Sequence, residues 1–201
     1  MAAPVGIKRA QVIDAAVAVL EESGRLDGVA LATVAARLGV RTQSLYAHVD
    51  GLDGLRRDLA LRGLSQLADR LTEAAVGRAG GDAVDAIIRA YLTFAAEHPG
   101  LYEAGLRAPG GDPELIAAMS AVMRPLNLVF ASYGLDEEQA LHWYRIVFAA
   151  VHGLATLRHD GLITLPGDIE ETVDRLCVAL TAQIEAEVRP AVATVSSAGS
   201  R

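Results

Sequence analysis

The sequence is poor in aromatic residues and cysteine, and it has no excess of positive charge. Only 4% of its 201 residues are Phe, Trp or Tyr, and a single cysteine, Cys177, allows no disulfide within the chain. That usage suits a reducing cytoplasm, where we expect Cys177 to be a buried small apolar residue. The N-terminus lacks a secretory apolar segment, and no apolar run approaches the ~20 residues of a membrane-spanning helix. We therefore expect a cytoplasmic protein without a membrane partner.

Charge is unevenly distributed along the chain. The formal charge is −7, yet residues 1–57 hold seven Lys and Arg against six Asp and Glu. The negative excess therefore lies in the rest of the chain. A near-neutral N-terminal part joined to an acidic body is compatible with a protein that touches nucleic acid at one end only. It also predicts weak non-specific binding, because few cations can displace counterions from DNA.

Hydrophobic residues make up 52% of the chain, which is enough for a sizeable core. Ala and Leu are abundant and β-branched runs are short, so composition and spacing favour an all-α protein. We expect residues 1–51 to form an N-terminal helical domain, 52–190 a larger helical domain, and 191–201, rich in Ser, Ala and Thr, a disordered tail. The predicted helices cover 7–23, 31–38, 40–49, 52–76, 83–97, 100–107, 112–133, 136–159 and 169–188.

The most informative segment is 31–49, LATVAARLGVRTQSLYAHV. Its first eight residues carry apolar side chains at the i, i+3, i+4, i+7 spacing of an amphipathic helix. Gly39 follows, where a helix end favours a residue that adopts positive φ. Val40 and Leu45 then anchor a second short helix whose other side chains are mostly polar. The pattern is typical of a helix-turn-helix that offers a row of hydrogen-bonding groups to the major groove.

Residues 7–65 resemble the DNA-binding domain of the tetracycline-repressor (TetR) family. The resemblance rests on the V-A-x-x-L-G-V turn of residues 34–40 and the L-Y-x-H-V sequence of residues 45–49, with a long helix after them. It implies a helix-turn-helix domain, a helical ligand-binding domain and a homodimer. Three features differ from the family pattern. Arg41 replaces the usual Ser or Thr, Leu52 replaces a phosphate-binding lysine, and no hydroxyl residue opens the second helix.

The second helix of the motif supplies most of the predicted DNA contacts. Gln43 can bond adenine bidentately, and Arg41 can reach guanine or a phosphate. Arg56 or Arg57 could replace the missing lysine. The alternative is an ordinary solvated short helix, which leaves a Tyr and a His beside a glycine turn unexplained. The predicted DNA-binding residues are Thr33, Arg41, Thr42, Gln43, Ser44, Tyr46 and His48.

Large or polar-tipped residues on the later helices suggest a pocket for a small, largely apolar effector. His98-Pro99 ends one predicted helix close to Tyr102 in the next, so polar side chains and a chain break coincide. The alternative for any single residue is core packing, with Met filling gaps. The predicted ligand-binding residues are Tyr91, His98, Tyr102, Met119, Met123, Phe130, Trp143, Phe148 and His152.

The last two predicted helices carry more apolar surface than a hairpin can bury against one neighbour. A four-helix bundle formed by two copies of the chain would bury it. Gly153 would let the partner's helix approach closely, at a cost of ~1 kcal/mol relative to Ala. The alternative is a contact within one chain. The predicted interface residues are Val147, Val151, Leu154, Val173, Leu176, Leu180 and Ile184.

No pattern in the sequence indicates catalysis or a cofactor. We find no phosphate-binding loop, nucleophile elbow or paired carboxylates. His142 and His152 would face about 80° apart on one helix, so we predict no metal site. The sequence therefore predicts a ligand-responsive transcriptional regulator, most simply a repressor that binds a palindromic operator in double-stranded DNA as a homodimer. The alternatives are a small all-α ligand carrier or enzyme with an incidental helix-turn-helix, and a DNA-binding regulator without a ligand.

Overall fold

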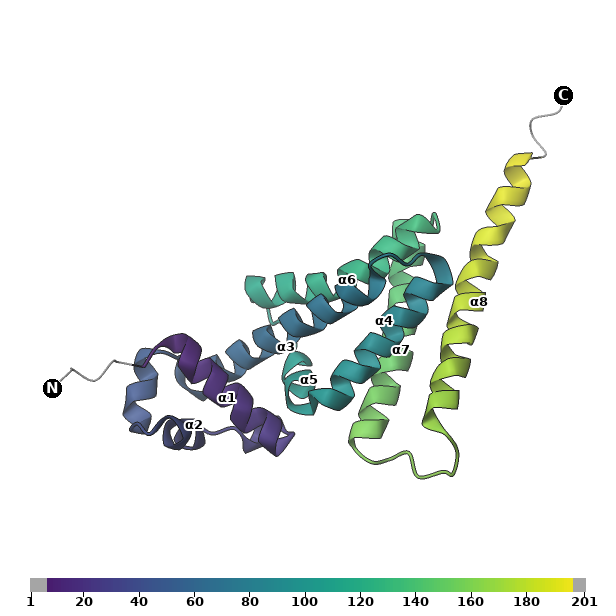
Figure 1. Ribbon diagram of the computed structural model, residues 1–201. Helices are drawn as coiled ribbons and strands as arrows, with labels where there is room; N and C mark the ends of the chain where they lie inside the picture. Colours follow the sequence, from purple (N-terminus) through teal and green to yellow (C-terminus); the bar gives the residue numbers. More distant parts are fainter. Residues whose placement is uncertain (1–6, 197–201) are drawn as a thin grey trace. The chain divides into compact units, whose positions relative to one another are not determined.

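The structure is a computed structural model that describes residues 7–196, with side chains described as far as residue 188. This part of the chain is helical and contains no strand, which confirms the predicted all-α fold (Figure 1). Two short 3₁₀ helices, η1 and η2, accompany the α-helices. In chain order the elements are α1 (Arg9–Ser23), η1 (Leu26–Gly28), α2 (Leu31–Leu38), η2 (Thr42–Ala47), α3 (Gly51–Ala75), α4 (Gly80–Glu97), α5 (Pro99–Gly105), α6 (Pro113–Ser132), α7 (Glu137–His159) and α8 (Ile169–Ser196).

The predicted end of the last helix is wrong. α8 continues to Ser196, whereas the sequence predicted a disordered tail from residue 191. The remaining residues of the predicted tail, 197–201, lie outside the described part of the chain.

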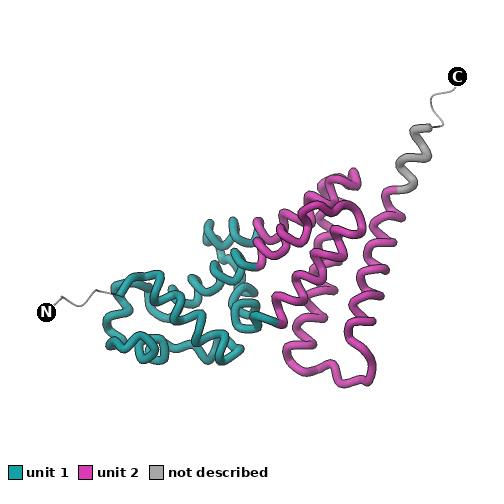
Figure 2. The backbone as a smooth tube through the Cα atoms, in the orientation of Figure 1, with its two compact units in different colours: residues 1–66, 97–119 teal, residues 67–96, 120–201 magenta. Residues whose placement is uncertain are grey.

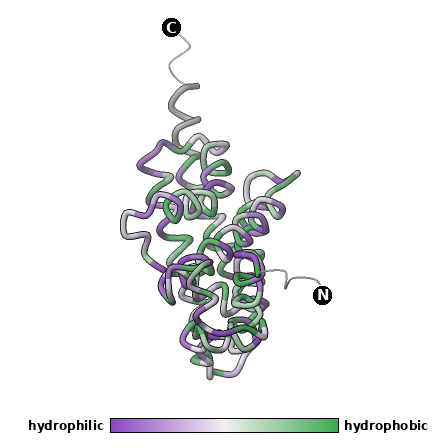
Figure 3. The backbone as a smooth tube through the Cα atoms, turned by 90° about the vertical axis from the view of Figure 1, so that its left-hand side faces the viewer, coloured by the Kyte–Doolittle hydropathy of each residue, from purple (hydrophilic) through white to green (hydrophobic). Residues whose placement is uncertain are grey.

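The chain divides into two compact units, which do not follow the predicted boundary at residue 51 (Figure 2). Unit 1 comprises residues 1–66 and 97–119, and unit 2 comprises 67–96 and 120–201. The N-terminal helices therefore share unit 1 with most of α3, with α5 and with the start of α6. Hydrophilic and hydrophobic residues are interspersed along each helix (Figure 3), as expected of amphipathic helices that bury one face.

Unit 1 is held together by close contacts of α5 with α1 and α3. A Cβ atom on Gly63 of α3 would lie 2.4 Å from the carbonyl oxygen of Leu101 in α5. A Cβ atom on Gly100 of α5 would lie 2.6 Å from Cγ of Leu20 in α1. Glycine at both positions therefore allows helix backbones to approach where any larger residue would force them apart.

Carboxylates add polar contacts between the same helices. Glu21 Oε1 on α1 accepts a hydrogen bond from the backbone amide of Leu101 at 3.0 Å. Glu103 Oε2 on α5 accepts one from the amide of Leu26 at 2.8 Å, where η1 begins. These amides open their helices and have no partner within them, so each carboxylate acts as a helix cap supplied by a distant element.

Unit 2 is built around the inner faces of α4, α7 and α8, where Ile88, Val147 and Ile184 are buried. Cys177 of α8 is buried there as expected, and its thiol hydrogen-bonds to Asp85 of α4. Burial, followed by that hydrogen bond and the charge of Asp85, raises the pKa of the thiol to about 12. The thiol therefore stays protonated and unreactive at neutral pH.

α6 is long and apolar enough to span a membrane by length and composition alone, contrary to the expectation from the sequence. A core helix of a soluble protein passes the same test. α6 buries Leu115 in unit 1 and Leu126 and Phe130 in unit 2. Part of the apolar surface of α6 is therefore buried inside the protein.

Candidate nucleic-acid interface and ligand cavity

A glycine turn joins α2 to η2, as the sequence predicted. Gly39 adopts φ +67°, a conformation that residues with a Cβ rarely reach. Its amide donates to the carbonyl of Ala36 at 3.1 Å, and the amide of Val40 donates to the carbonyl of Ala35 at 3.0 Å. These bonds close the C-terminus of α2 and redirect the chain into η2 within three residues.

η2 is a 3₁₀ helix anchored by buried side chains at its centre and just beyond its end. Leu45 is completely buried and Val49 is 5% exposed. Tyr46, between them, is 60% exposed, and Gln43 and Ser44 are also exposed. The anchors fix the orientation of η2, so its polar side chains face solvent as a set.

Most of the predicted DNA-binding residues come together on or beside η2. Arg41 is exposed immediately before it, while Thr42 and His48 are half-buried. Thr33 stands apart on α2, where its hydroxyl donates to the carbonyl of Ala30 at 2.7 Å and accepts from the Ala30 amide at 3.2 Å. Thr33 thus bonds back to the residue that precedes α2, and Ala30 at that position offers no capping side chain.

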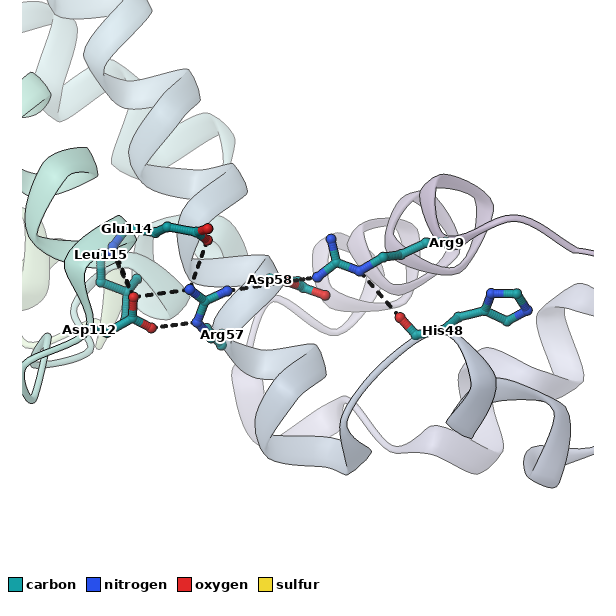
Figure 4. A network of polar contacts seen from close by, with 7 residues as sticks. All are labelled: Arg9, His48, Arg57, Asp58, Asp112, Glu114 and Leu115. Carbon is teal, nitrogen blue, oxygen red and sulfur yellow. Dashed lines mark hydrogen bonds and ion pairs between the residues drawn. The ribbon is translucent and has the colours of Figure 1, made fainter.

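A network of hydrogen bonds and ion pairs connects His48, the residue after η2, with α1, α3 and the start of α6 (Figure 4). Arg9 donates from Nε to the carbonyl of His48 at 3.2 Å and from Nη2 to Asp58 Oδ1 at 2.6 Å. Asp58 is 4.0 Å from Nη1 of Arg57. Arg57 in turn binds Asp112, and its Nη2 donates to Glu114 Oε2 at 2.8 Å. All these residues belong to unit 1.

The two aspartates of this network have opposite pKa shifts. Burial raises the pKa of Asp58, although the charges of Arg9 and Arg57 oppose the shift. The hydrogen bond from Arg57, helped by the backbone amides of Leu115 and Glu114, lowers the pKa of Asp112 to about 2. Asp112 is therefore ionised at neutral pH and holds Arg57 in an ion pair.

Unit 2 contains an apolar cavity of about 40 Å³. Tyr91 and Tyr144 supply its polar tips, and burial raises the pKa of Tyr144, so that hydroxyl stays neutral. Phe148 lies between aromatic rings, 5.9 Å from Tyr144 and 5.3 Å from His152 between ring centres. The full lining is Leu71, Ile87, Ile88, Tyr91, Val122, Leu126, Tyr144, Val147, Phe148 and Val151.

The cavity takes in only two of the nine predicted ligand-binding residues, Tyr91 and Phe148. His152 is adjacent through its stack on Phe148. The other six do not line this cavity, and their contact with a ligand stays a prediction. His98 Nδ1 lies 3.1 Å from Glu21, Tyr102 is buried in unit 1, Met119 belongs to unit 1, Met123 lies outside the lining, Phe130 is completely buried, and Trp143 donates to Glu187.

The lining residues that the prediction missed are mostly aliphatic. On α7 they follow the helical period, since Tyr144, Val147, Phe148 and Val151 stand at i, i+3, i+4 and i+7. That stripe was visible in the sequence.

Five of the seven predicted interface residues are buried inside the single chain. Val147, Val151, Val173, Leu180 and Ile184 are each at most 8% exposed, and only Leu154 and Leu176 are half-buried. The five therefore contribute to the core of unit 2, and their place in a dimer interface stays a prediction.

Comparison with known proteins supports the interpretation of the N-terminal motif. Residues 84–180 match a family described as tetracyclin repressor-like, C-terminal domain. The chain is 36% identical over 165 residues to the uncharacterized HTH-type transcriptional regulator Rv0681 of Mycobacterium tuberculosis, covering 81% of this chain and 75% of that protein. It is 32% identical over 157 residues to the uncharacterized HTH-type transcriptional regulator YobS of Bacillus subtilis, covering 78% and 82%.

Solved structures of other proteins share the fold of this chain. Apo ActR from Streptomyces coelicolor matches 94% of this chain and 100% of its own, with a TM-score of 0.69 at 18% identity. The relatives found by sequence are both described as helix-turn-helix transcriptional regulators. With its glycine turn, its exposed polar row on η2 and relatives at more than 30% identity over about four-fifths of its length, the chain belongs to the TetR family of helix-turn-helix transcriptional regulators.

Proposed function

We propose that this regulator acts in the cytoplasm as a homodimeric repressor, which binds a palindromic operator through η2 and releases it when a small apolar molecule enters the cavity of unit 2. The proposed DNA contact rests on the burial pattern around η2: apolar anchors are buried, and a row of polar side chains is exposed. Gln43 can read adenine, and Ser44 and Tyr46 can bond bases or phosphates.

The ion pairs of unit 1 indicate which cations bind phosphate. Residues 7–66 contain eight Lys and Arg. Lys8, Arg41 and Arg56 have no carboxylate partner among the described residues, and Nε of Arg56 is buried without a hydrogen bond. We assign phosphate binding to these three, with Arg56 in place of the family's lysine. The other five are paired with acids: Arg9, Arg25, Arg37, Arg57 and Arg62.

Salt dependence tests this assignment. Each phosphate contact contributes about 0.9 to the slope of log affinity against log salt concentration. Arg41→Gln and Arg56→Gln should each reduce the slope by about one, measured by fluorescence anisotropy on an operator selected from random duplexes. Arg37→Gln and Arg62→Gln remove cations that are already paired and should leave it nearly unchanged. Equal slopes for all four variants and the wild type would refute the assignment.

A second copy of the chain is the proposed partner of α7 and α8. On α7, Ile146, Ala149, Gly153 and Leu157 fall within roughly 80° of arc, on the side opposite the stripe that lines the cavity. Ile146 and Leu157 are 48% and 45% exposed. On α8, Val178 is 69% exposed and lies opposite the buried stripe. Two such faces can form a four-helix bundle across a two-fold axis.

Gly153 fits this arrangement. No atom of its own chain lies within 4 Å of the place where its Cβ would be. A glycine in mid-helix costs about 1 kcal/mol relative to Ala, and no contact among the described residues requires it. Close approach of the partner's helix supplies a reason for the glycine.

The effector must enlarge the cavity to bind. A space of 40 Å³ holds roughly three water molecules, whereas ligand pockets usually measure about 300–1,000 Å³. Phe148 is 39% exposed and can swing outward to admit an apolar or aromatic ligand in its place. The neutral Tyr144 hydroxyl can donate to an acceptor on that ligand.

The proposed response passes along α3. This single helix carries Leu71 of the cavity wall and Arg57 of the network behind η2. Displacement of α3 by a ligand would change the separation of the two η2 segments in the dimer. They would then no longer match half-sites about one helical turn (~34–36 Å) apart, and the operator would be released.

A further inference from the structure

A second hollow lies in unit 2, between the C-terminal end of α3 with the loop after it and the second half of α6. Its volume is about 450 Å³, within the usual range of small-molecule sites. It is distinct from the 40 Å³ cavity, since the two linings share no residue. The hollow exists without any rearrangement of side chains.

The floor and walls of this groove are mainly apolar. Val76 at the end of α3 is 71% exposed, and Leu128 on α6 is 61% exposed. Val129 is buried beneath them. Exposed aliphatic side chains that gather around one hollow are suited to cover the hydrocarbon part of a ligand.

Among the polar groups that line the groove, two arginines offer hydrogen-bond donors to a ligand. The hydroxyls of Thr72 and Ser132 donate to carbonyls of their own helices, each at 2.7 Å. Arg78 donates a hydrogen bond from Nη1 to the carbonyl of Ala74 at 2.8 Å, and its other guanidinium N–H groups remain available to a ligand. Arg124 has no hydrogen bond or ion pair among the described residues, and no carboxylate lines the groove.

We infer that this groove is a second ligand site, which binds an amphipathic carboxylate. Its head would lie on Arg78 and Arg124, and its hydrocarbon part on Val76, Leu128 and Val129. Two cations without a facing acid are unusual in a chain whose 25 acidic residues outnumber its 18 Lys and Arg. An anion supplies the missing charge, and guanidinium groups bind carboxylates through short, charge-assisted hydrogen bonds. The inference does not depend on DNA binding or on the apolar effector.

The test uses sodium octanoate, below the concentration at which it forms micelles, titrated by calorimetry into the full-length protein without DNA. Arg124→Gln should lower octanoate affinity at least tenfold and leave the weaker binding of octan-1-ol unchanged. Arg145→Gln is the matched control, because it removes an exposed charge of α7 that lines neither hollow.

Three results would overturn the inference. One is absence of octanoate binding. Another is an equal loss of affinity in Arg124→Gln and Arg145→Gln, which would mean that net charge alone attracts the anion. The third is octanoate binding that survives Arg124→Gln but is abolished by Val151→Phe, which would place the ligand in the smaller cavity. Because no DNA is present, each result is independent of the proposed regulatory function.

Discussion

Replacing Ile146 and Val178 together with Glu is expected to yield a monomer and to reduce operator affinity by about 10²–10⁴-fold. The size of the loss follows from avidity, because a monomer binds one half-site without the second contact that a dimer brings at high effective concentration. Both side chains are exposed in the single chain, so the charges should not disrupt its own core. Light scattering gives the mass, and anisotropy on the selected operator gives the affinity.

Leu165→Glu provides the control for this double variant. Leu165 is 84% exposed in the segment between α7 and α8, so this change adds a charge at an apolar position away from the proposed face. It should remain a dimer with native affinity. Gly153→Ala adds a second test, since it should stabilise an isolated chain by about 1 kcal/mol but weaken a dimer in which helices meet there. A dimeric double variant with full affinity would place the interface elsewhere.

Gly63→Ala is expected to destabilise the protein by about 1–3 kcal/mol or more, as overpacking does. The new methyl group would meet the carbonyl oxygen of Leu101 at 2.4 Å, and a backbone atom cannot move aside without shifting α5. For a chain of this size the melting temperature should fall by roughly 2–12 °C. Thermal unfolding followed by circular dichroism measures it.

Gly105→Ala is the matched substitution. Its Cβ would lie 3.6 Å from Leu64, an ordinary van der Waals contact, and Ala favours helix over Gly. The melting temperature should therefore stay the same or rise. If both variants behaved alike, close approach of α3 and α5 would not explain Gly63.

The helix-turn-helix was predictable because its signals are local. A glycine that needs positive φ, such as Gly39, and an anchor such as Leu45 are read from a few neighbouring residues. The same holds for the long helices, whose apolar periodicity extends over several turns. The 3₁₀ geometry of η2 was not predicted, since the sequence suggested only a short helix.

The cavity and the proposed interface were harder to predict because α7 carries apolar or small residues on two faces. Val147 and Val151 face the cavity, whereas Ile146 and Leu157 face solvent. Both faces are helical stripes, and only tertiary packing decides which one is covered by the same chain. The residues predicted for the interface lie mostly on the buried stripe for that reason.

Ion pairs between residues that are distant in the sequence could not be predicted either. Arg56 and Arg57 are neighbours with the same chemistry, and the sequence left open which one binds phosphate. The fold brings Asp112 and Glu114 to Arg57, whereas Arg56 has no carboxylate partner in the described part of the chain. The choice depends on residues more than 50 positions away, so it could be proposed only once the structure was known.

Operator binding by variants of η2 tests the central proposal most directly. Gln43→Ala and Tyr46→Ala should each weaken binding to the selected operator by about 1–3 kcal/mol, which is roughly 5–150-fold. Their circular dichroism spectra and melting curves should match the wild type, because both side chains are exposed. Anisotropy titrations at one fixed salt concentration measure the effect. Unchanged operator affinity in both variants, with the fold intact, would contradict the assignment of η2 as the segment that reads DNA.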